Sequence, residues 1–317
     1  MTLQERLGQR AVFLRAIREY FYQKNIIEVD TPILSQFGNP DPALLNFVAT
    51  YHGPGRLHQK PLFLITSPEY HMKRLLAAGV EDCYYLGKVF RDGELSSRHN
   101  PEFTMLEWYR LGFSLEALMD EIILLVQTLT EKNLAVEFYT YREAFETFLE
   151  VNPFEATLDD LLALIKKHNI DLGFTPKDRD EAFDLIVSFL IEPAFDPEKL
   201  TLLYHYPASQ ASLAKIVTDD AGNLVGKRFE LYWKGLELAN GYEELTDSKE
   251  QRNRFENENR AREEAGYRAV PIDEKMLEVL DDLPYCSGVA MGVDRLMMAL
   301  WGKSKIEEVV PFGLDEA

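Results

Sequence analysis

The first apolar pattern along the chain has the period of a helix. Apolar residues recur at three- and four-residue spacing over residues 7–22, with arginine and glutamate between them, which predicts an amphipathic helix. These positions are Leu7, Ala11, Leu14 and Ile17. The β-branched segment 26–34 that follows contains Pro32, which cannot donate a hydrogen bond within a sheet. We therefore expect an edge strand, or a strand that meets another surface, after the first helix.

Most later segments have the pattern of strands joined by turns. Residues 84–91 and 102–109 flank a polar loop and predict a long hairpin. Further strand candidates are residues 62–66, 202–206, 212–217 and 227–239, and a glycine-containing strand that runs into a helix over 285–301. Helical patterns occupy 114–130 and a charged segment that begins at Asp247 or Ser248 and continues to residue 265.

Residues 150–200 are rich in charge and in helical periodicity, and nothing rich in serine or glycine flanks them. This predicts a helical insertion rather than a separate domain. Strands joined by hairpins, with helices around them, predict an α+β fold with a mostly antiparallel sheet. We expect a single domain over residues 1–317.

The charge balance narrows the classes of function. The 317 residues include 53 acidic and 34 basic groups, so the formal charge is −19, which argues against electrostatic binding of nucleic acid. Such a charge suits a cytoplasmic protein that handles cations or contacts a basic partner. Cys83 and Cys286 form no Cys-x-x-Cys pair. The first residues are not apolar, and no run approaches ~18 apolar residues, so we expect no secreted or membrane protein.

The hairpin of residues 84–109 carries the first candidate chemistry. Arg91 ends one strand and Phe103 begins the next, so both would lie on one surface. Arginine is a forked donor for phosphate oxygens, and phenylalanine offers a face on which a purine can stack. The alternative is a solvated charged turn beside a core phenylalanine, and this segment alone favours that alternative.

A second candidate lies near the end of the chain. Gly288 and Gly292 allow a close approach of backbone, and Arg295 falls in the first turn of the helix that follows. A cation at the positive end of a helix dipole is favourable when an anion such as phosphate also binds there. A pair of packing glycines before an ordinary helix explains the pattern equally well.

A third candidate is a set of carboxylates. Glu230, Glu237 and Glu244 recur every seven residues, but Gly235 and the surrounding alternation favour strands around a turn over a helix. Carboxylates on adjacent strands are suitable ligands for Mg²⁺, which takes one or two of them together with nucleotide phosphates. In so acidic a chain the alternative is an exposed acidic face.

In combination, these segments resemble the motifs of class II aminoacyl-tRNA synthetases. Residues 27–34 are similar to motif 1, whose proline (here Pro32) lies at a dimer interface, so a homodimer is implied. The segments around Arg91 and Arg295 resemble motifs 2 and 3. Segments 66–76, 99–107 and 237–241 are most similar to lysyl-tRNA synthetases, and the resemblance covers nearly the whole chain. It implies a class II antiparallel sheet flanked by helices.

Lysyl-tRNA synthetases carry an N-terminal β-barrel that reads the anticodon, whereas motif 1 arrives here by residue 32. We therefore expect no anticodon-binding barrel and no tRNA substrate. A bare core with this motif 2 resembles the ligases that attach (R)-β-lysine to elongation factor P. The resemblance implies activation of (R)-β-lysine or lysine by ATP and Mg²⁺, and transfer to a lysine of elongation factor P. The alternatives are a truncated lysyl-tRNA synthetase, a non-catalytic regulatory module, and an asparagine-synthetase-like core.

The resemblance also implies roles for individual residues. The catalytic arginines would be Arg91, which holds the α-phosphate, and Arg295, which reaches the γ-phosphate. The remaining ATP contacts implied are Glu94, His99, Asn100, Phe103, Glu237, Leu238 and Gly292. The Mg²⁺ ligands implied are Glu230 and Glu237. The amino-acid pocket implied consists of Ser67, Glu69, Glu107, Tyr109, Asn240, Glu244 and Ala290.

Two positions depart from the synthetase pattern. After the motif 2 arginine the chain has Asp92-Gly93-Glu94, so the glutamate expected at 93 stands at 94. Ala290 replaces a glycine that is common in lysyl-tRNA synthetases, a change that could shape the pocket for the β-isomer.

Overall fold

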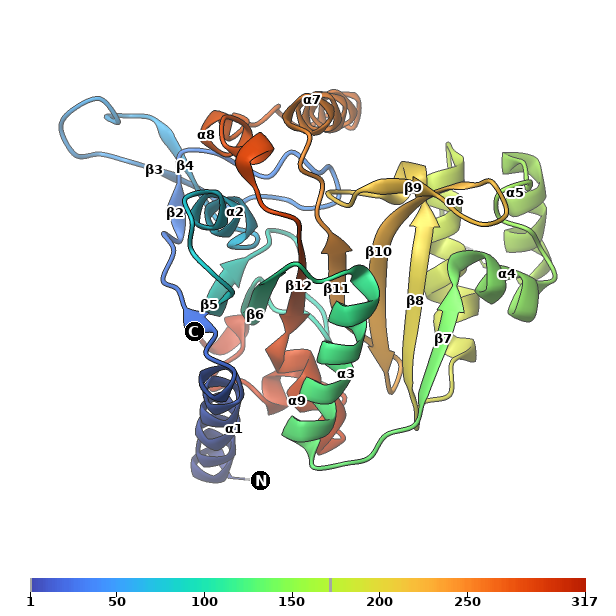
Figure 1. Cartoon of the computed structure of the whole chain (residues 1–317), viewed down its shortest axis with the longest axis horizontal. Coiled ribbons are helices and arrows are strands. Elements are labelled where there is room, and N and C mark those ends of the chain that lie inside the picture. The colour runs from blue at the N-terminus through green and yellow to red at the C-terminus, as the bar shows by residue number, and fades with distance from the viewer. Residues whose placement is uncertain (1, 171–172) are drawn as a thin grey trace.

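The computed structural model describes residues 2–170 and 173–317; residues 171–172, within the segment predicted as an insertion, lie outside it. A nine-stranded sheet forms its centre (Figure 1). Eight strands lie side by side in the order β1 (Ile27–Glu28), β5 (Cys83–Phe90), β6 (Glu102–Leu111), β12 (Cys286–Gly292), β11 (Leu236–Glu243), β10 (Leu224–Trp233), β8 (Leu200–Pro207) and β7 (Val136–Thr140). The ninth, β9 (Ile216–Thr218), pairs with β10.

The sheet has the character expected from the sequence. Only β1 with β5 and β7 with β8 run parallel, and the other neighbours are antiparallel. The expected α+β fold is therefore confirmed. The segment around Pro32 supplies only the two-residue edge strand β1 and then β2 (Leu34–Ser35), as expected for a strand that proline interrupts. Neither sheet closes on itself within residues 2–170 and 173–317.

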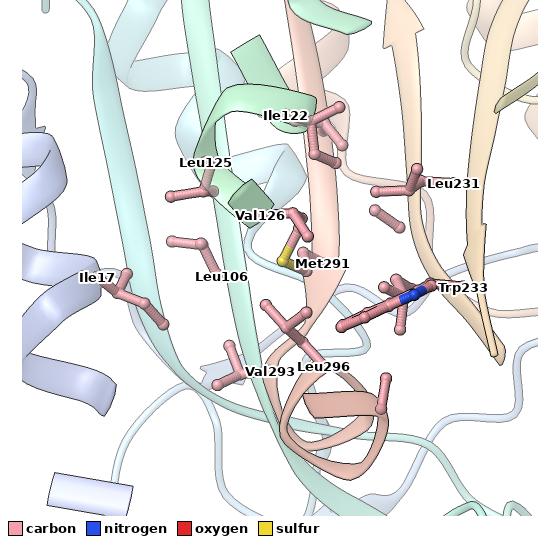
Figure 2. Packing of buried hydrophobic residues seen from close by; sticks show 14 of the residues in the cluster. Ile17, Leu106, Ile122, Leu125, Val126, Leu231, Trp233, Met291, Val293 and Leu296 are labelled. Atoms are coloured by element: carbon pink, nitrogen blue, oxygen red, sulfur yellow. The ribbon is translucent and has the colours of Figure 1, made fainter. Parts of the chain in front are cut away.

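One face of the sheet packs on three helices. These are α1 (Leu3–Gln23), α3 (Leu115–Thr130) and α9 (Val293–Trp301). Their apolar side chains pack against every second residue of the strands. Figure 2 shows this for the helix residues Ile17 and Ile122 and the strand residues Leu106 and Met291, all fully buried. Because neighbours along a strand point to opposite faces, burying Leu106 in this core turns Glu107 to the other face.

The opposite face is partly covered by a second layer. It contains α2 (Glu69–Ala77), α7 (Ser248–Glu264), α8 (Glu274–Leu277) and a small sheet of β2, β4 (Pro61–Leu64) and β3 (Val48–Thr50). Phe255 of α7 and Met72 of α2 belong to one buried apolar cluster with Tyr109 of β6. In Figure 1, α7 and α8 lie above the upper end of β11 and β12. This layer forms the wall of the cavity described below.

Helices also pack beside β7 and β8. They are α4 (Tyr141–Leu149), α5 (Leu158–Lys167) and α6 (Arg179–Ile186), and they share a third apolar cluster with β8. Past its last residue, α6 continues as a π-helical turn, Val187–Ile191, which ends before Pro193. In the described part of the chain no helix is long and apolar enough to span a membrane.

Candidate active site

A cavity of about 350 Å³ opens on the sheet face that points away from α3 and α9. Every side chain assigned to ATP, Mg²⁺ or the amino acid from the sequence lines this cavity, from Ser67 on the α2 side to Arg295 on α9. Pro32 does not line it. The sheet thus brings together residues that lie more than two hundred positions apart in the chain.

The floor of the cavity is a row of four residues on neighbouring strands. Glu107 of β6 pairs with Ala290 of β12, Ala290 with Asn240 of β11, and Asn240 with Glu230 of β10. Residues that pair across a sheet project from the same face. The register therefore points three candidate pocket residues and one candidate Mg²⁺ ligand into one space.

The upper end of the cavity is acidic. Glu69 of α2, Glu107 and Glu244 line it, and all three side chains are buried or nearly so. Lys73 Nζ lies 2.6 Å from Glu69 Oε1 and 2.7 Å from Glu244 Oε2. The hydroxyl of Tyr109 donates to Glu107 Oε1 over 2.9 Å, whereas Glu107 Oε2 has no hydrogen-bond partner among the described residues.

Burial shifts the protonation of these carboxyls. Burial and then the charge of Glu69 raise the pKa of Glu107 well above its usual range. Burial raises the pKa of Glu244 to about 7, an effect that the Lys73 ammonium opposes. Near neutral pH this end of the cavity can therefore gain or lose protons, and a cation that enters it would favour the ionised forms.

The opposite end of the cavity carries arginine. The guanidinium carbon of Arg91 lies 5.2 Å from the centre of the Phe103 ring, and Arg91 Nη1 lies 3.6 Å from Glu94 Oε1. Gly93 has a φ of 79°, a left-handed conformation that glycine adopts without strain. This explains the departure from the synthetase pattern, because a glutamate at 93 would be strained and the carboxylate stands instead at 94.

Arg295 lies at the start of α9, beside residues of motif 2. Its Nη1 is 3.4 Å from Glu237 Oε2 and donates to Glu237 O over 3.0 Å, and its Nη2 contacts His99 Nε2. Burial and the charge of Arg295 lower the pKa of His99. Asn100 has a different environment. Its Nδ2 donates to Glu102 O and its Oδ1 accepts from Leu314 N, so both polar atoms of its side chain are hydrogen-bonded to backbone groups.

Glu230 and Glu237 are the carboxylates that suit a metal ion. Partial burial and then the neighbouring charge of Glu230 raise the pKa of Glu237, a repulsion that a divalent cation would relieve. Glu230 already accepts hydrogen bonds from Arg228, Tyr206 and Tyr232. Within residues 2–170 and 173–317, no group of three or more His, Cys, Asp or Glu could hold a metal alone. The pair therefore fits an ion that takes its remaining ligands from a nucleotide.

Comparison with known proteins agrees with this geometry. The family model described as tRNA synthetases class II (D, K and N) matches residues 1–316. The chain belongs to the class II tRNA synthetase family. It is also 44% identical, over 313 residues, to a Salmonella gallinarum protein named elongation factor P–(R)-β-lysine ligase, a match that covers 98% of this chain and 95% of that protein.

Sequence reasoning missed one residue of this class II synthetase site, Lys73, which forms two ion pairs there. Lys73 stands four residues after Glu69, a spacing that in a helix places the two side chains on one face and could have indicated the first ion pair. The second ion pair, with Glu244, has no sequence signal, because its partner follows 171 residues later (244 − 73).

Proposed function

We propose that this protein is an ATP-dependent ligase that activates (R)-β-lysine, or lysine, and transfers it to a lysine side chain of elongation factor P. The observation that carries the proposal is the polarity of the cavity. Glu69, Glu107 and Glu244 lie at one end, and Arg91 and Arg295 lie at the other. The relative named as an elongation factor P–(R)-β-lysine ligase supports the same assignment.

The acidic end suits an amino acid with two ammonium groups. Charge-assisted hydrogen bonds from ammonium to carboxylate are stronger than neutral ones. Glu107 Oε2 is buried without a partner, and an entering ammonium group would satisfy it. Asn240 and Ala290 lie in the same row of the sheet and would line the amino-acid chain.

The arginine end suits the nucleotide. Glu237 on β11 and Glu244, which directly follows this strand, are seven residues apart, roughly 23 Å at the rise of a strand, which leaves room for an extended adenylate between the two ends. Arg91 and Arg295 would bind the phosphates, and Phe103 would support the adenine. Glu230 and Glu237 would hold Mg²⁺, which supplies charge neutralisation at the phosphates.

The proposed reaction has two steps. A carboxylate oxygen of the amino acid attacks the α-phosphorus of ATP, and the bond to the bridging oxygen of the β-phosphate breaks to release pyrophosphate. The neutral ε-amine of the acceptor lysine then attacks the carbonyl carbon, and the bond from that carbon to the phosphate oxygen breaks. AMP leaves, and the nitrogen passes a proton to a phosphate oxygen of the departing AMP. The arginines stabilise phosphate charge in both steps, and no protein nucleophile is needed.

The remaining parts of the proposal concern partners and assembly. A formal charge of −19 is poorly suited to gripping tRNA, and a translation factor as substrate places the reaction in the cytoplasm. We propose a homodimer formed through α1 and the segment around Pro32, where large apolar side chains are exposed. They are Val12, Tyr22, Ile27, Ile33 and Leu34. Residues 1–317 would act as one catalytic domain with the helices of 150–200 as an insertion.

Intact-mass analysis of elongation factor P tests the function. The factor is incubated with this protein, ATP and Mg²⁺, and with (R)-β-lysine or α-lysine in parallel, and a mass gain of one lysyl group is expected with at least one isomer. A parallel reaction with total tRNA is expected to give no aminoacylated product. Charging of tRNA without modification of the factor would favour a lysyl-tRNA synthetase, and the absence of both products would contradict the proposal.

A further inference from the structure

Lys73 is among the largest fully buried side chains of the described residues, with 1% of it exposed. It lies on α2 between Glu69 and Glu244 and forms ion pairs with both carboxylates. Lys73 does not itself line the cavity, whereas both of its partners do. It therefore sits behind the acidic end of the site, where it can act on a bound molecule only through these two carboxylates.

A buried ammonium group is unfavourable unless its charge is compensated. Burial opposes the charged form of Lys73, but the neighbouring Glu244 and Glu69 outweigh it and raise the pKa of the lysine. Lys73 is therefore cationic at every pH at which the protein would be assayed. Its charge in turn opposes the protonation of Glu244, which burial favours.

The helix fixes this cation in place. Met72 and Leu76, its neighbours on α2, are fully buried, and Met72 packs in the same apolar cluster as Phe255 and Tyr109. The rigid backbone leaves Lys73 close to both carboxylates without reaching the cavity.

We propose that Lys73 is a positioning residue that sets the charge of the amino-acid pocket. When Glu69, Glu107 and Glu244 are all ionised, as a bound cation favours, their three charges and the one fixed ammonium leave two negative charges. These match the two ammonium groups of a diamino acid. A monoamino acid would leave one of these buried carboxylates uncompensated, so the same arrangement excludes it. This inference rests on the proposed function, because it assigns Lys73 a role in the binding of that substrate.

The test is the pH dependence of the KM for the amino acid in pyrophosphate exchange. Without the lysine charge, the pKa of Glu244, which burial already raises to about 7, would rise further, and a protonated Glu244 would bind ammonium groups weakly. For Lys73→Met we expect a KM raised by about tenfold or more at about pH 6.5, and a smaller ratio to the wild-type KM at about pH 8.5, where the carboxylates ionise. The KM for ATP is expected to change by less than about twofold, because the arginine end is untouched.

The control is Lys177→Met. Lys177 also pairs with a glutamate at i,i+4 spacing, Glu181, but its side chain is 76% exposed and lies outside the cavity. This variant should keep the wild-type KM at every pH. Lys73→Arg, which retains the charge, should restore most of the affinity that Lys73→Met loses.

A structural role alone would raise KM by the same factor at each pH, and this result, or an unchanged KM, would overturn the inference. If Lys73→Met is too unstable for assay at alkaline pH, its Tm is compared with that of the wild type instead. A difference in Tm that grows from about pH 6.5 to about pH 8.5 supports the inference, and a constant difference overturns it. Failure of the wild type to exchange pyrophosphate with any lysine isomer would instead overturn the proposed function, and this inference with it.

Discussion

Gly288 of β12 lies directly opposite Tyr109 of β6, and the tyrosine ring covers the space where a side chain on residue 288 would begin. A Cβ placed on Gly288 would be 2.3 Å from Tyr109 Cε1 and 2.7 Å from Glu244 Oε1. The absent side chain is therefore what lets the tyrosine and the carboxylate meet at the acidic end of the cavity.

Gly288→Ala should impair binding of the amino acid and spare that of ATP. The methyl group displaces the Tyr109 ring, which orients Glu107, so we expect the KM for the amino acid to rise by about tenfold or more. Gly292, beside Arg295, is four residues away along the strand, so the affinity for ATP measured by calorimetry should be retained. The control is Gly8→Ala on α1, where no atom lies within 4 Å and a gain of up to about 1 kcal/mol in stability is expected. An unchanged KM for Gly288→Ala would show that the ring does not position the substrate.

Arg91→Ala should remove most of the activation step. The guanidinium is proposed to hold the α-phosphate, and removing one such donor to a developing charge lowers the rate by about a hundredfold or more. The measurement is amino-acid-dependent pyrophosphate exchange. Arg252→Ala, which deletes an exposed arginine paired with Glu274, serves as a control and should retain full exchange. Near-normal exchange in Arg91→Ala would contradict the proposed role of this arginine at the α-phosphate.

Local patterns in the sequence found the elements and the reactive residues, but not how the strands align. Within the strand candidate 227–239, Gly235 predicts a turn, and the structure has one: Lys234 and Gly235, both with positive φ, join β10 and β11 in a hairpin. Because of that turn, Glu230 lies on β10 and Glu237 on β11. Glycine at 235 was the local signal for the turn, but no local signal gives the register that places Asn240 opposite Glu230.

The resemblance to synthetases predicted which residues would surround the substrates, and every residue assigned to ATP, Mg²⁺ or the amino acid lines the cavity. The resemblance did not predict the pKa values or the ion pairs of these residues. The burial that raises the pKa of Glu107, and the ammonium of Lys73 between two carboxylates, depend on how α2 packs against the sheet. Such tertiary contacts join positions far apart in the sequence, so periodicity cannot reveal them.

Binding of the amino acid should release protons. Burial raises the pKa of Glu107 and raises that of Glu244 to about 7, so part of the Glu244 population is protonated at neutral pH. Ammonium groups favour the ionised carboxylates, and affinity should therefore increase as the pH rises through about 7. Calorimetry in two buffers of different ionisation enthalpy at about pH 7.5 should show release on the order of half to one proton per site. Glu107→Gln should reduce this number, and binding without proton release would contradict the assignment of these carboxyls.

The exposed apolar surface of α1 and residues 27–34 should form the dimer interface. Ile27 is 51% exposed on the edge strand, where no neighbouring strand covers its outer side. Ile27→Asp would place a charge in that interface and should shift the protein from dimer to monomer, as measured by light scattering at micromolar concentration. Leu224→Asp, at a residue 58% exposed on β10, is the matched control and should leave the mass unchanged. A monomeric wild type would refute the proposed dimer.

The buried ion pair of Arg10 and Asp294 should contribute far more to stability than a similar pair on the surface. Arg10 Nη1 lies 2.6 Å from Asp294 Oδ1, and Asp294 Oδ2 accepts from the Thr104 amide, so α1, β6 and α9 are joined next to Arg295. Arg10→Met leaves a buried carboxylate without its cation and should cost about 3–5 kcal/mol in urea denaturation.

Arg18→Met breaks an ion pair with Glu28 in which both side chains are at least 40% exposed, and it should cost less than about 1 kcal/mol. Adding Asp294→Asn to Arg10→Met removes the uncompensated charge and should recover part of the loss. Equal costs for the two arginine variants would mean that Asp294 is stabilised without Arg10. In that case α9, and Arg295 with it, would depend on the Thr104 hydrogen bond and the apolar packing of the helix.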